Sequence, residues 1–250
     1  MRHAGDVARA RASLETRRGA NLRYVLRKRF SWMRPYLGEG RHAVELGCGA
    51  GFSRMFLDAP LELTDVEPQP WVDRVVDALA MPYSDASVDV LIANNVIHHL
   101  ATPPRFFAEA ARVLRAGGHL LVQECACSLA TRLAIRVTGH EAYSFDADPF
   151  DPAAVCNDPA DPWSANCAIP DLLFDDHGRF ERAFAAFEVV DDGKSEFLLH
   201  FNSGGVTASA PYVPLPQPLM RVADAVDAAL VALLPGVFAA QRRVVLRRRP

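Results

Sequence analysis

The stretch Ala43-Val44-Glu45-Leu46-Gly47-Cys48-Gly49-Ala50-Gly51-Phe52 decides the fold of this chain. A short apolar run ends in three glycines at alternating positions, and the carboxylate of Glu45 precedes the first glycine by two residues. Because glycine lacks a Cβ, such a turn can adopt strained dihedral angles and bring bare backbone against a ligand. At the carboxyl end of a parallel strand, this is where open α/β sheets bind nucleotides. The stretch therefore predicts a nucleotide-type cofactor site.

The charge beside the turn narrows the choice of cofactor. A dinucleotide or a nucleoside triphosphate would bring phosphates close to Glu45, and like charges repel at that range. S-adenosylmethionine (SAM) has no phosphate and carries a cationic sulfonium and an ammonium group. A nicotinamide dinucleotide is further disfavoured because Phe52 and Ser53 stand where a dinucleotide turn has its third glycine. The turn favours SAM.

Length and composition predict one large domain. The chain has 250 residues, of which 50% are hydrophobic, and no apolar run approaches the roughly 20 residues that span a bilayer. The N-terminus is rich in arginine but lacks the apolar block of a secretory signal, so we expect a cytoplasmic protein. Five cysteines without a C-x-x-C pair predict neither a disulfide framework nor a zinc site.

The net charge of −3 hides a strong segregation of charge. Residues 1–41 hold 11 Lys/Arg and 3 Asp/Glu, whereas residues 42–240 hold 11 basic and 27 acidic residues. An acidic body of this kind disfavours nucleic acid, which needs basic side chains to neutralise its phosphates. The basic N-terminal helix is interpreted as a solvated face rather than an anion contact. We expect a small-molecule acceptor, no nucleic acid and no stable membrane insertion.

Hydrophobic periodicity predicts alternating strands and helices in the first half of the chain. A helix over 13–37 is followed by strands at 42–46, 61–65, 74–78, 88–93 and 119–123, with helices from residue 52 and over 103–114. This alternation is typical of a parallel sheet covered by helices on both faces.

The pattern changes after residue 124. We expect a helix over 128–138, a strand over 187–201 broken at 191–193, a Pro-rich connector at 211–218, a helix at 219–234 packed on the sheet, and a last strand at 237–247. Residues 140–170 are rich in Asp, Pro and aromatic residues and have little periodicity. A loop of this length inside a compact domain is usually a lid or a binding loop.

Several of these motifs, in this order, resemble those of the class I SAM-dependent methyltransferases that act on small molecules. The resemblance covers about residues 40–125 and includes ELGCGAG, VVDALAMPYSDASVDVL, LIANNVIHHL and RVLRAGGHLLVQE. It implies a Rossmann-like, seven-stranded mixed sheet of order 3-2-1-4-5-7-6, with helices on both faces and an inserted lid on the substrate side. The single domain 1–250 would then comprise an N-terminal helical segment, a cofactor core, a lid and acceptor region, and C-terminal strands with a helix, at 1–38, 40–125, 128–185 and 187–250.

The resemblance also implies which residues bind the cofactor. The glycine turn would approach the methionyl part of SAM, Asp65 would bind the ribose hydroxyls, and Asp77-Ala78 would contact the adenine edge. Asn94 and Asn95 would bring the chain to the methyl-transfer site. The full implied set is Glu45, Gly47, Cys48, Gly49, Gly51, Phe52, Asp65, Val66, Asp77, Ala78, Asn94 and Asn95.

The segment between the second and third strands departs from the family pattern. Only eleven residues separate Asp65 from Asp77, where the family usually has a helix. The Pro68–Pro70 segment with Trp71 is expected to replace that helix. Trp71 either packs on the adenine or fills the core.

Candidate catalytic residues follow the fourth strand. His98 and His99 lie at the mouth of the expected site, and histidine with its ordinary pKa of about 6.5 suits a general base. The alternative is that one of them packs against the following helix and neither touches substrate.

Candidate acceptor-binding residues lie in the loop. Tyr143, Trp163, Asn166 and His177 would contact the acceptor, although the aromatic residues of the loop could equally pin it to the domain. Aspartates 146, 148 and 151 have a spacing that a metal site could use, but aspartates among prolines more often form a solvated loop. No metal site is expected.

These observations favour an enzyme that transfers the methyl group of SAM to a small-molecule or glycan-type acceptor, with O-methylation as the first expectation. Two alternatives stay open. One is a non-catalytic partner subunit that keeps the SAM fold, and the other, less favoured, is a nicotinamide-dependent dehydrogenase.

Overall fold

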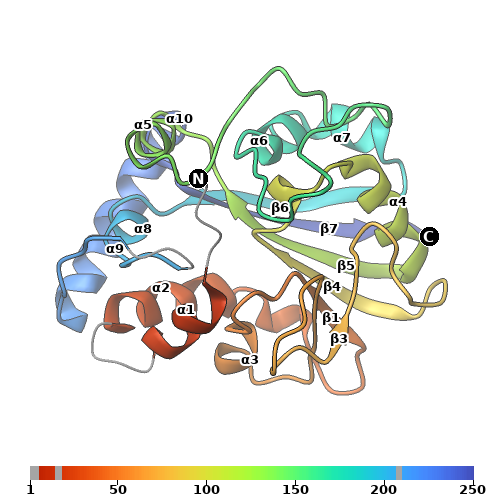
Figure 1. Cartoon of the computed structure of the whole chain (residues 1–250), viewed down its shortest axis with the longest axis horizontal. Coiled ribbons are helices and arrows are strands. Elements are labelled where there is room, and N and C mark those ends of the chain that lie inside the picture. Colours follow the sequence, from red (N-terminus) through yellow and green to blue (C-terminus); the bar gives the residue numbers. More distant parts are fainter. Residues whose placement is uncertain (1–5, 15–18, 207–209) are drawn as a thin grey trace.

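A seven-stranded sheet organises the chain (Figure 1). The computed structural model describes residues 6–14, 19–206 and 210–250. The strand order is β3-β2-β1-β4-β5-β7-β6, as the sequence predicts. The strands are β1 (Ala43–Leu46), β2 (Glu62–Asp65), β3 (Arg74–Val75), β4 (Val88–Asn94), β5 (Leu114–Cys125), β6 (Phe187–Ser195) and β7 (Gln241–Arg248). Strands β1 to β5 pair in parallel, and β7 runs antiparallel to both β5 and β6.

Two hydrophobic cores lie on opposite faces of this sheet. Successive side chains of a strand point to opposite faces. On β4, Leu91 and Ala93 therefore join one core while Val90 and Ile92 join the other. Figure 1 shows α4, α6 and α7 over the first face and α1, α2 and α3 over the second. The central strands are largely apolar on both faces because both are covered.

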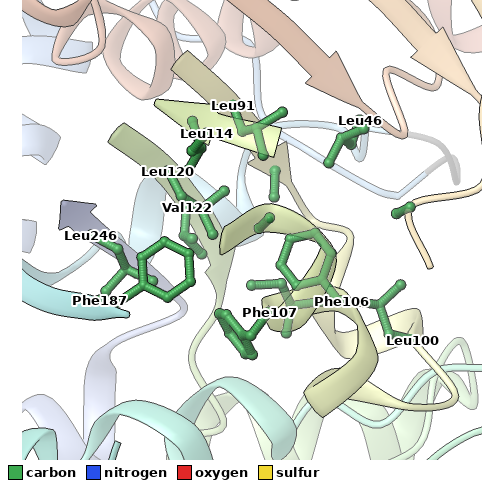
Figure 2. Close-up of a cluster of buried hydrophobic side chains, with 14 of the residues drawn as sticks. Leu46, Leu91, Leu100, Phe106, Phe107, Leu114, Leu120, Val122, Phe187 and Leu246 are labelled. Carbon is green, nitrogen blue, oxygen red and sulfur yellow. The ribbon is translucent and has the colours of Figure 1, made fainter. Parts of the chain in front are cut away.

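Helix α4 (Pro103–Val113) fills the first core. Its adjacent Phe106 and Phe107 are fully buried, and Figure 2 shows them among leucine and valine side chains of β4 and β5 and beside Phe187 of β6. Burying one such aromatic side chain stabilises a fold by about 1.5–3 kcal/mol. Helices α6 (Ile169–Phe174) and α7 (His177–Ala183) extend the same aromatic cluster through Phe174 and Phe180.

The N-terminal helical segment covers the second face. The sequence predicts one helix over 13–37, but the structure has α1 (Val7–Leu14), α2 (Ala20–Ser31) and a 3-10 turn, η2 (Arg34–Tyr36). Residues 15–18 of that prediction lie outside the described residues. At Gly19 a Cβ would lie 2.7 Å from the carbonyl oxygen of Leu14. The backbone of Gly19 therefore approaches that of Leu14 so closely that only glycine fits, and the described residues form two helices where the sequence predicts one.

Other expected boundaries also shift. Helix α3 is one turn, Ser53–Phe56, and β3 is shorter than the predicted 74–78. Strand β6 is not broken at 191–193 but continues to Ser195 through a register shift between Val189 and Asp191. The predicted second part of that strand is a helix, α8 (Leu198–Phe201), and the last strand is preceded by α10 (Pro235–Phe238). The antiparallel pairing with β7 continues through the polar residues of β6. This long-range pairing cannot be inferred from the local sequence.

Helix α9 (Gln217–Leu233) lies beside the sheet rather than on one of its faces (Figure 1). Its Met220 packs with Val25 of α2 and Leu199 of α8, and its Val231 packs with two alanines. The expectation that it covers the sheet is therefore corrected. Within the parts of the chain described, no helix combines the length and apolar character needed to cross a membrane.

Candidate active site

The glycine turn follows β1 and requires each of its glycines. Gly47, Gly49 and Gly51 have φ of 61°, 51° and 66°, in the left-handed region where L side chains are strained. A Cβ on Gly47 would lie 2.6 Å from Cγ2 of Val96, and a Cβ on Gly51 would lie 2.6 Å from Cδ1 of Trp71. A side chain at Gly47 or Gly51 would therefore clash, and at Gly49 the positive φ alone favours glycine.

Asp65 joins the end of β2 to this turn. Its Oδ2 accepts a hydrogen bond from the backbone N–H of Gly49 at 2.8 Å, and its Oδ1 accepts one from Glu67 at 3.1 Å. The carboxylate is only half buried. Each carboxylate oxygen has a second lone pair, so Asp65 can still accept hydrogen bonds from a diol. This arrangement fits the ribose of SAM.

Glu45 lies behind the turn and not at its surface. It is 2% exposed and accepts a hydrogen bond from Oγ of Ser53. Burial raises its pKa to about 8 even though the bond from Ser53 lowers it. The sequence argument treats Glu45 as a charge that meets the cofactor directly, whereas the structure makes it a buried carboxyl whose ionisation a nearby cation would favour.

The shortened connection after β2 brings Trp71 onto the glycine turn. The Trp71 indole N–H donates to the carbonyl of Gly49 at 2.8 Å. From α1, Arg11 donates to the carbonyl of Ala50 at 2.9 Å and stacks 4.8 Å from the centre of the indole ring. Trp71 therefore packs against the turn in the second core. Sequence reasoning missed Arg11, because only the fold brings α1 to this turn.

The predicted adenine-side residues gather at the ends of β2 and β3. Val66 follows β2 and is 48% exposed, Asp77 is exposed, and Ala78 is buried in the first core. The Asp77 Oδ1 accepts from the N–H of Leu79 at 2.8 Å, which fixes the turn after β3. An exposed valine beside a carboxylate is a suitable surface for a purine face and its amino group.

At the end of β4 the chain turns sharply into η3 (Ile97–His99). Asn95 has φ of 56°, an unusual conformation for a residue other than glycine. Its N–H donates to the carbonyl of Gln123 at 2.7 Å, and its side-chain amide donates to Asn94 at 3.0 Å. This turn sets the direction of the chain at the two histidines that follow it. It also lies next to the glycine turn, because Val96 packs against Gly47.

Glu124 orients this segment from the neighbouring strand. It is fully buried near the end of β5. Its Oε1 accepts from the N–H groups of Val96 and Ile97 at 2.8 and 2.6 Å, and its Oε2 lies 2.5 Å from Nδ1 of His98. Sequence reasoning missed Glu124, although an acid at the carboxyl end of the strand paired with β4 was a signal that could have found it.

The two histidines have opposite electrostatic environments. Burial by itself would lower the pKa of His98, but Glu124 and then Glu141 raise that pKa well above its ordinary value. Burial and then the charge of His98 lower the pKa of His99 to about 4. His99 donates through Nδ1 to the carbonyl of Ser164 at 3.0 Å, which leaves Nε2 with its lone pair. Without other ligands, His98 is the cation of the pair and His99 is neutral.

Glu141 reaches this pair from the loop between α5 (Leu129–Thr138) and α6. Its Oε1 lies 3.9 Å from Nε2 of His98, and its Oε2 accepts from the thiol of Cys167 at 2.8 Å. The loop has no helical or strand periodicity, so nothing in the sequence singled out Glu141. The predicted lid therefore contributes a carboxylate to the site.

Of the four predicted acceptor residues, Trp163 and Asn166 contact η3, Tyr143 lies in the loop, and His177 lies elsewhere. The Asn166 N–H donates to the carbonyl of His98 at 2.9 Å, and the ring of Trp163 packs edge-on against His99. Tyr143 and Asn166 line a cavity of about 410 Å³ within the loop. His177, by contrast, begins α7 and pairs with Asp192 of β6 at 2.8 Å.

One of the clustered aspartates of the loop forms an ion pair. Asp148 pairs with Arg179 at 3.0 Å, and both side chains are about half exposed. Among the residues that the structure describes, the two groups with metal-ligand spacing are His98–His99–Glu141 and His98–Glu124–Cys125. Neither includes the aspartates at 146, 148 or 151.

The fold is Rossmann-like, and the glycine turn lies at the carboxyl end of its parallel strands. The family profile described as methyltransferase domain matches residues 44–122. Residues 44–122 thus resemble a methyltransferase domain, and the SAM-dependent relatives matched over this region support SAM as the cofactor.

Curated relatives resemble the same region. A probable S-adenosylmethionine-dependent methyltransferase of Mycobacterium tuberculosis is 37% identical over 95 residues, covering 33% of this chain and 35% of that protein. An uncharacterized methyltransferase of Mycobacterium avium is 35% identical over 94 residues, covering 32% of this chain and 37% of that protein. The matched region spans little more than a third of the length of these relatives.

Solved structures resemble the fold over nearly the whole chain. A SAM-dependent methyltransferase from Archaeoglobus fulgidus matches with a TM-score of 0.56 at 14% identity, covering 91% of this chain and 94% of the other. A geranyl diphosphate C-methyltransferase from Streptomyces coelicolor matches with a TM-score of 0.51 at 12% identity, covering 92% and 80%. These two likenesses concern the fold alone.

Proposed function

We propose that this chain transfers the methyl group of SAM to an oxygen atom of a small-molecule or glycan-type acceptor. The observation that carries the proposal is one juxtaposition at the carboxyl end of the parallel strands. The glycine turn with Asp65 lies after β1 and β2, and the oriented histidine pair lies after β4. Val96 joins the two parts, since it packs against Gly47.

The cofactor would lie across this edge of the sheet. The glycine turn would receive the methionyl part, Asp65 the ribose, and Val66 with Asp77 the adenine. Bound SAM supplies an electrophilic methyl carbon whose leaving group departs as a neutral thioether. The main task of the protein is then to hold an acceptor oxygen in line with that carbon at about 3 Å.

His99 is the better candidate of the two histidines for receiving the acceptor proton. Its Nδ1–H is committed to the Ser164 carbonyl, so the lone pair of Nε2 remains available to accept a proton. His98 instead pairs with Glu124 and carries the positive charge of the two histidines. We therefore assign His98 to positioning and His99 to proton transfer.

The loop after α5 would close over the acceptor. Asn157 donates to the carbonyls of His98 and Leu100, both at 2.9 Å, and Asn166 adds a third bond to η3. Trp163 offers an aromatic face next to His99, which suits the apolar face of a sugar or an aromatic acceptor. Few cations occur in this region, since no Lys or Arg lies between 137 and 178. A neutral or cationic acceptor fits better than an anion.

Binding experiments separate this function from the two alternatives. A ligand that binds only the native state raises its apparent melting temperature. We expect S-adenosylhomocysteine to stabilise the chain and Asp65→Ala to abolish the shift, while NAD has no effect. Stabilisation by NAD with none by S-adenosylhomocysteine would overturn the proposal in favour of a dehydrogenase.

Turnover with a panel of hydroxylated acceptors separates an enzyme from a SAM-binding partner subunit. His99→Gln should lower the rate of S-adenosylhomocysteine release by about 100-fold, the usual range for a lost general base. The thermal shift with S-adenosylhomocysteine should stay unchanged in that variant. His42→Gln is the matched control, because His42 pairs with Glu62 at the opposite end of β1. Equal rates in both variants would remove His99 from the mechanism.

A further inference from the structure

Three potential metal ligands converge where η3 meets the loop after α5. One nitrogen of His98, one of His99 and one carboxylate oxygen of Glu141 lie within 4.8 Å of one another. The histidines follow β4, whereas Glu141 comes from a loop that begins after α5. Methyl transfer from SAM does not by itself require a carboxylate at this position. The convergence needs another explanation.

Each histidine is oriented as metal-binding histidines are. A ligating imidazole typically donates its other ring N–H to a carboxylate or a backbone carbonyl, which fixes the tautomer and aims the free nitrogen. His98 has its Nδ1 against Glu124, and His99 has its Nδ1 against the carbonyl of Ser164. The Nε2 atoms of both rings are thus left for a ligand. The rings lie side by side, with centroids 4.1 Å apart.

Glu141 is oriented in the same manner. The Cys167 thiol donates to its Oε2, and its Oε1 faces Nε2 of His98 across 3.9 Å. That separation is too long for a hydrogen bond. Two ligands at about 2.1 Å from a tetrahedral ion lie about 3.4 Å apart, so the gap is close to that of a shared ion. An ion pair that existed only for its charges would be expected to close this distance.

The exposure of the three side chains leaves one side open. The side chain of His98 is 3% exposed, whereas that of Glu141 is 28% exposed. Structural zinc sites are closed by four protein ligands, while catalytic sites keep three and leave a position for water or substrate. The other group with suitable spacing uses Glu124, whose oxygens already bind two backbone amides and His98. The group with Glu141 is the better site.

We propose that Nε2 of His98, Nε2 of His99 and Oε1 of Glu141 bind a divalent first-row transition-metal ion with open coordination positions. Two imidazoles and one carboxylate suit zinc or iron, and they suit magnesium poorly because magnesium prefers an all-oxygen shell. The two histidines must both be neutral in this complex, so binding releases a proton. The expectation from sequence that the chain has no metal site is revised here.

The ion has a direct use in the reaction, and this part of the inference rests on the proposed function. An acceptor hydroxyl bound at an open position would lose its proton more readily, because a bound cation lowers the pKa of coordinated water or alcohol. The oxygen–methyl bond forms, the sulfur–methyl bond breaks, and the hydroxyl proton passes to solvent. In the metal-loaded site the ion replaces His99 as the means of activating the acceptor.

Direct metal binding tests the site without any assay of methyl transfer. The full chain, stripped with a chelator, is titrated with Zn²⁺ by calorimetry, and with Co²⁺ while the visible absorption spectrum is followed. We expect one equivalent of each ion to bind, with no competition from millimolar Mg²⁺. Glu141→Gln and His99→Ala should each weaken binding by at least about 100-fold, since each removes a ligand. His42→Gln, at the other end of the sheet, should bind as the unchanged chain does.

Three results would each overturn the site. The first is binding of less than a tenth of an equivalent of metal ion per chain, and the second is an unchanged metal affinity in Glu141→Gln. The third is a cobalt spectrum with the charge-transfer band of thiolate ligation, which would point to the nearby cysteines. Thermal shift with S-adenosylhomocysteine on the same samples separates this inference from the proposed function. A shift with S-adenosylhomocysteine but no zinc binding overturns the metal site alone, whereas zinc binding without that shift overturns the methyltransferase function.

Discussion

The buried carboxyl of Glu45 makes a sharp prediction about stability and pH. Glu45 is 2% exposed, and its pKa in the folded chain is raised to about 8 from a reference of 4.5. Below the pKa that Glu45 has in the unfolded chain, the folded and the unfolded states both hold the proton, so Glu45 does not make stability depend on pH. Between the two pKa values, the folded state keeps a proton that the unfolded state has lost. The free energy of unfolding therefore falls as pH rises from about 4.5 and levels off only above about 8.

The size of this effect follows from the shift. Each pKa unit corresponds to about 1.4 kcal/mol, so a shift from 4.5 to about 8 corresponds to a loss of up to about 5 kcal/mol across the range. Glu45→Gln removes the titration while keeping an oxygen that can accept from Ser53. The variant should match the unchanged chain near pH 5 and exceed it by several kcal/mol at pH 8.5.

Urea unfolding at intervals between pH 5 and 9 measures this difference. Other groups titrate too, but the difference between the two chains isolates Glu45, because the midpoint shift at constant m reports stability. Glu39→Gln, at an exposed glutamate, makes the same chemical change without burial and should show no such difference. Parallel pH profiles for the unchanged chain and Glu45→Gln would refute the reasoning, since they would mean that Glu45 titrates alike in both states.

Three further outcomes are expected. Gly51→Ala should lower the free energy of unfolding in urea by about 1–3 kcal/mol, because the new Cβ meets an indole ring and φ is positive. Arg29→Met should lower the free energy of unfolding by about 3–5 kcal/mol in the same assay, because it leaves Glu196 buried without the partner that lies 2.7 Å from it. The double variant with Glu196→Leu should recover much of that loss. Asn166→Ala should raise the acceptor KM with little change in the thermal shift by S-adenosylhomocysteine, because it removes the side-chain hydrogen bonds to the backbone of Ser144 that hold the loop together but touches no predicted cofactor contact; a change confined to the cofactor shift would contradict the role given to this residue.

The sequence by itself predicted the glycine turn and the positions of the parallel strands. Gly47, Gly49 and Gly51 can be recognised without a structure, because the need for positive φ is a local property of each residue. The strands could be found because apolar residues of a sheet covered on both faces form short continuous runs. Their order came from the motif resemblance, and pairing along the sheet agrees with it.

Tertiary structure decided what the individual side chains of the site do. Glu124 and Glu141 lie 26 and 43 positions from His98 in the chain, and no local pattern links them. The same is true of Arg11, which α1 brings to the glycine turn from 39 positions away. Even Glu45, which sequence reasoning did select, changes from a surface charge to a buried carboxyl once Ser53 and the second core surround it. The pKa and the orientation of a side chain depend on every atom packed around it, and those atoms come together only when the chain folds.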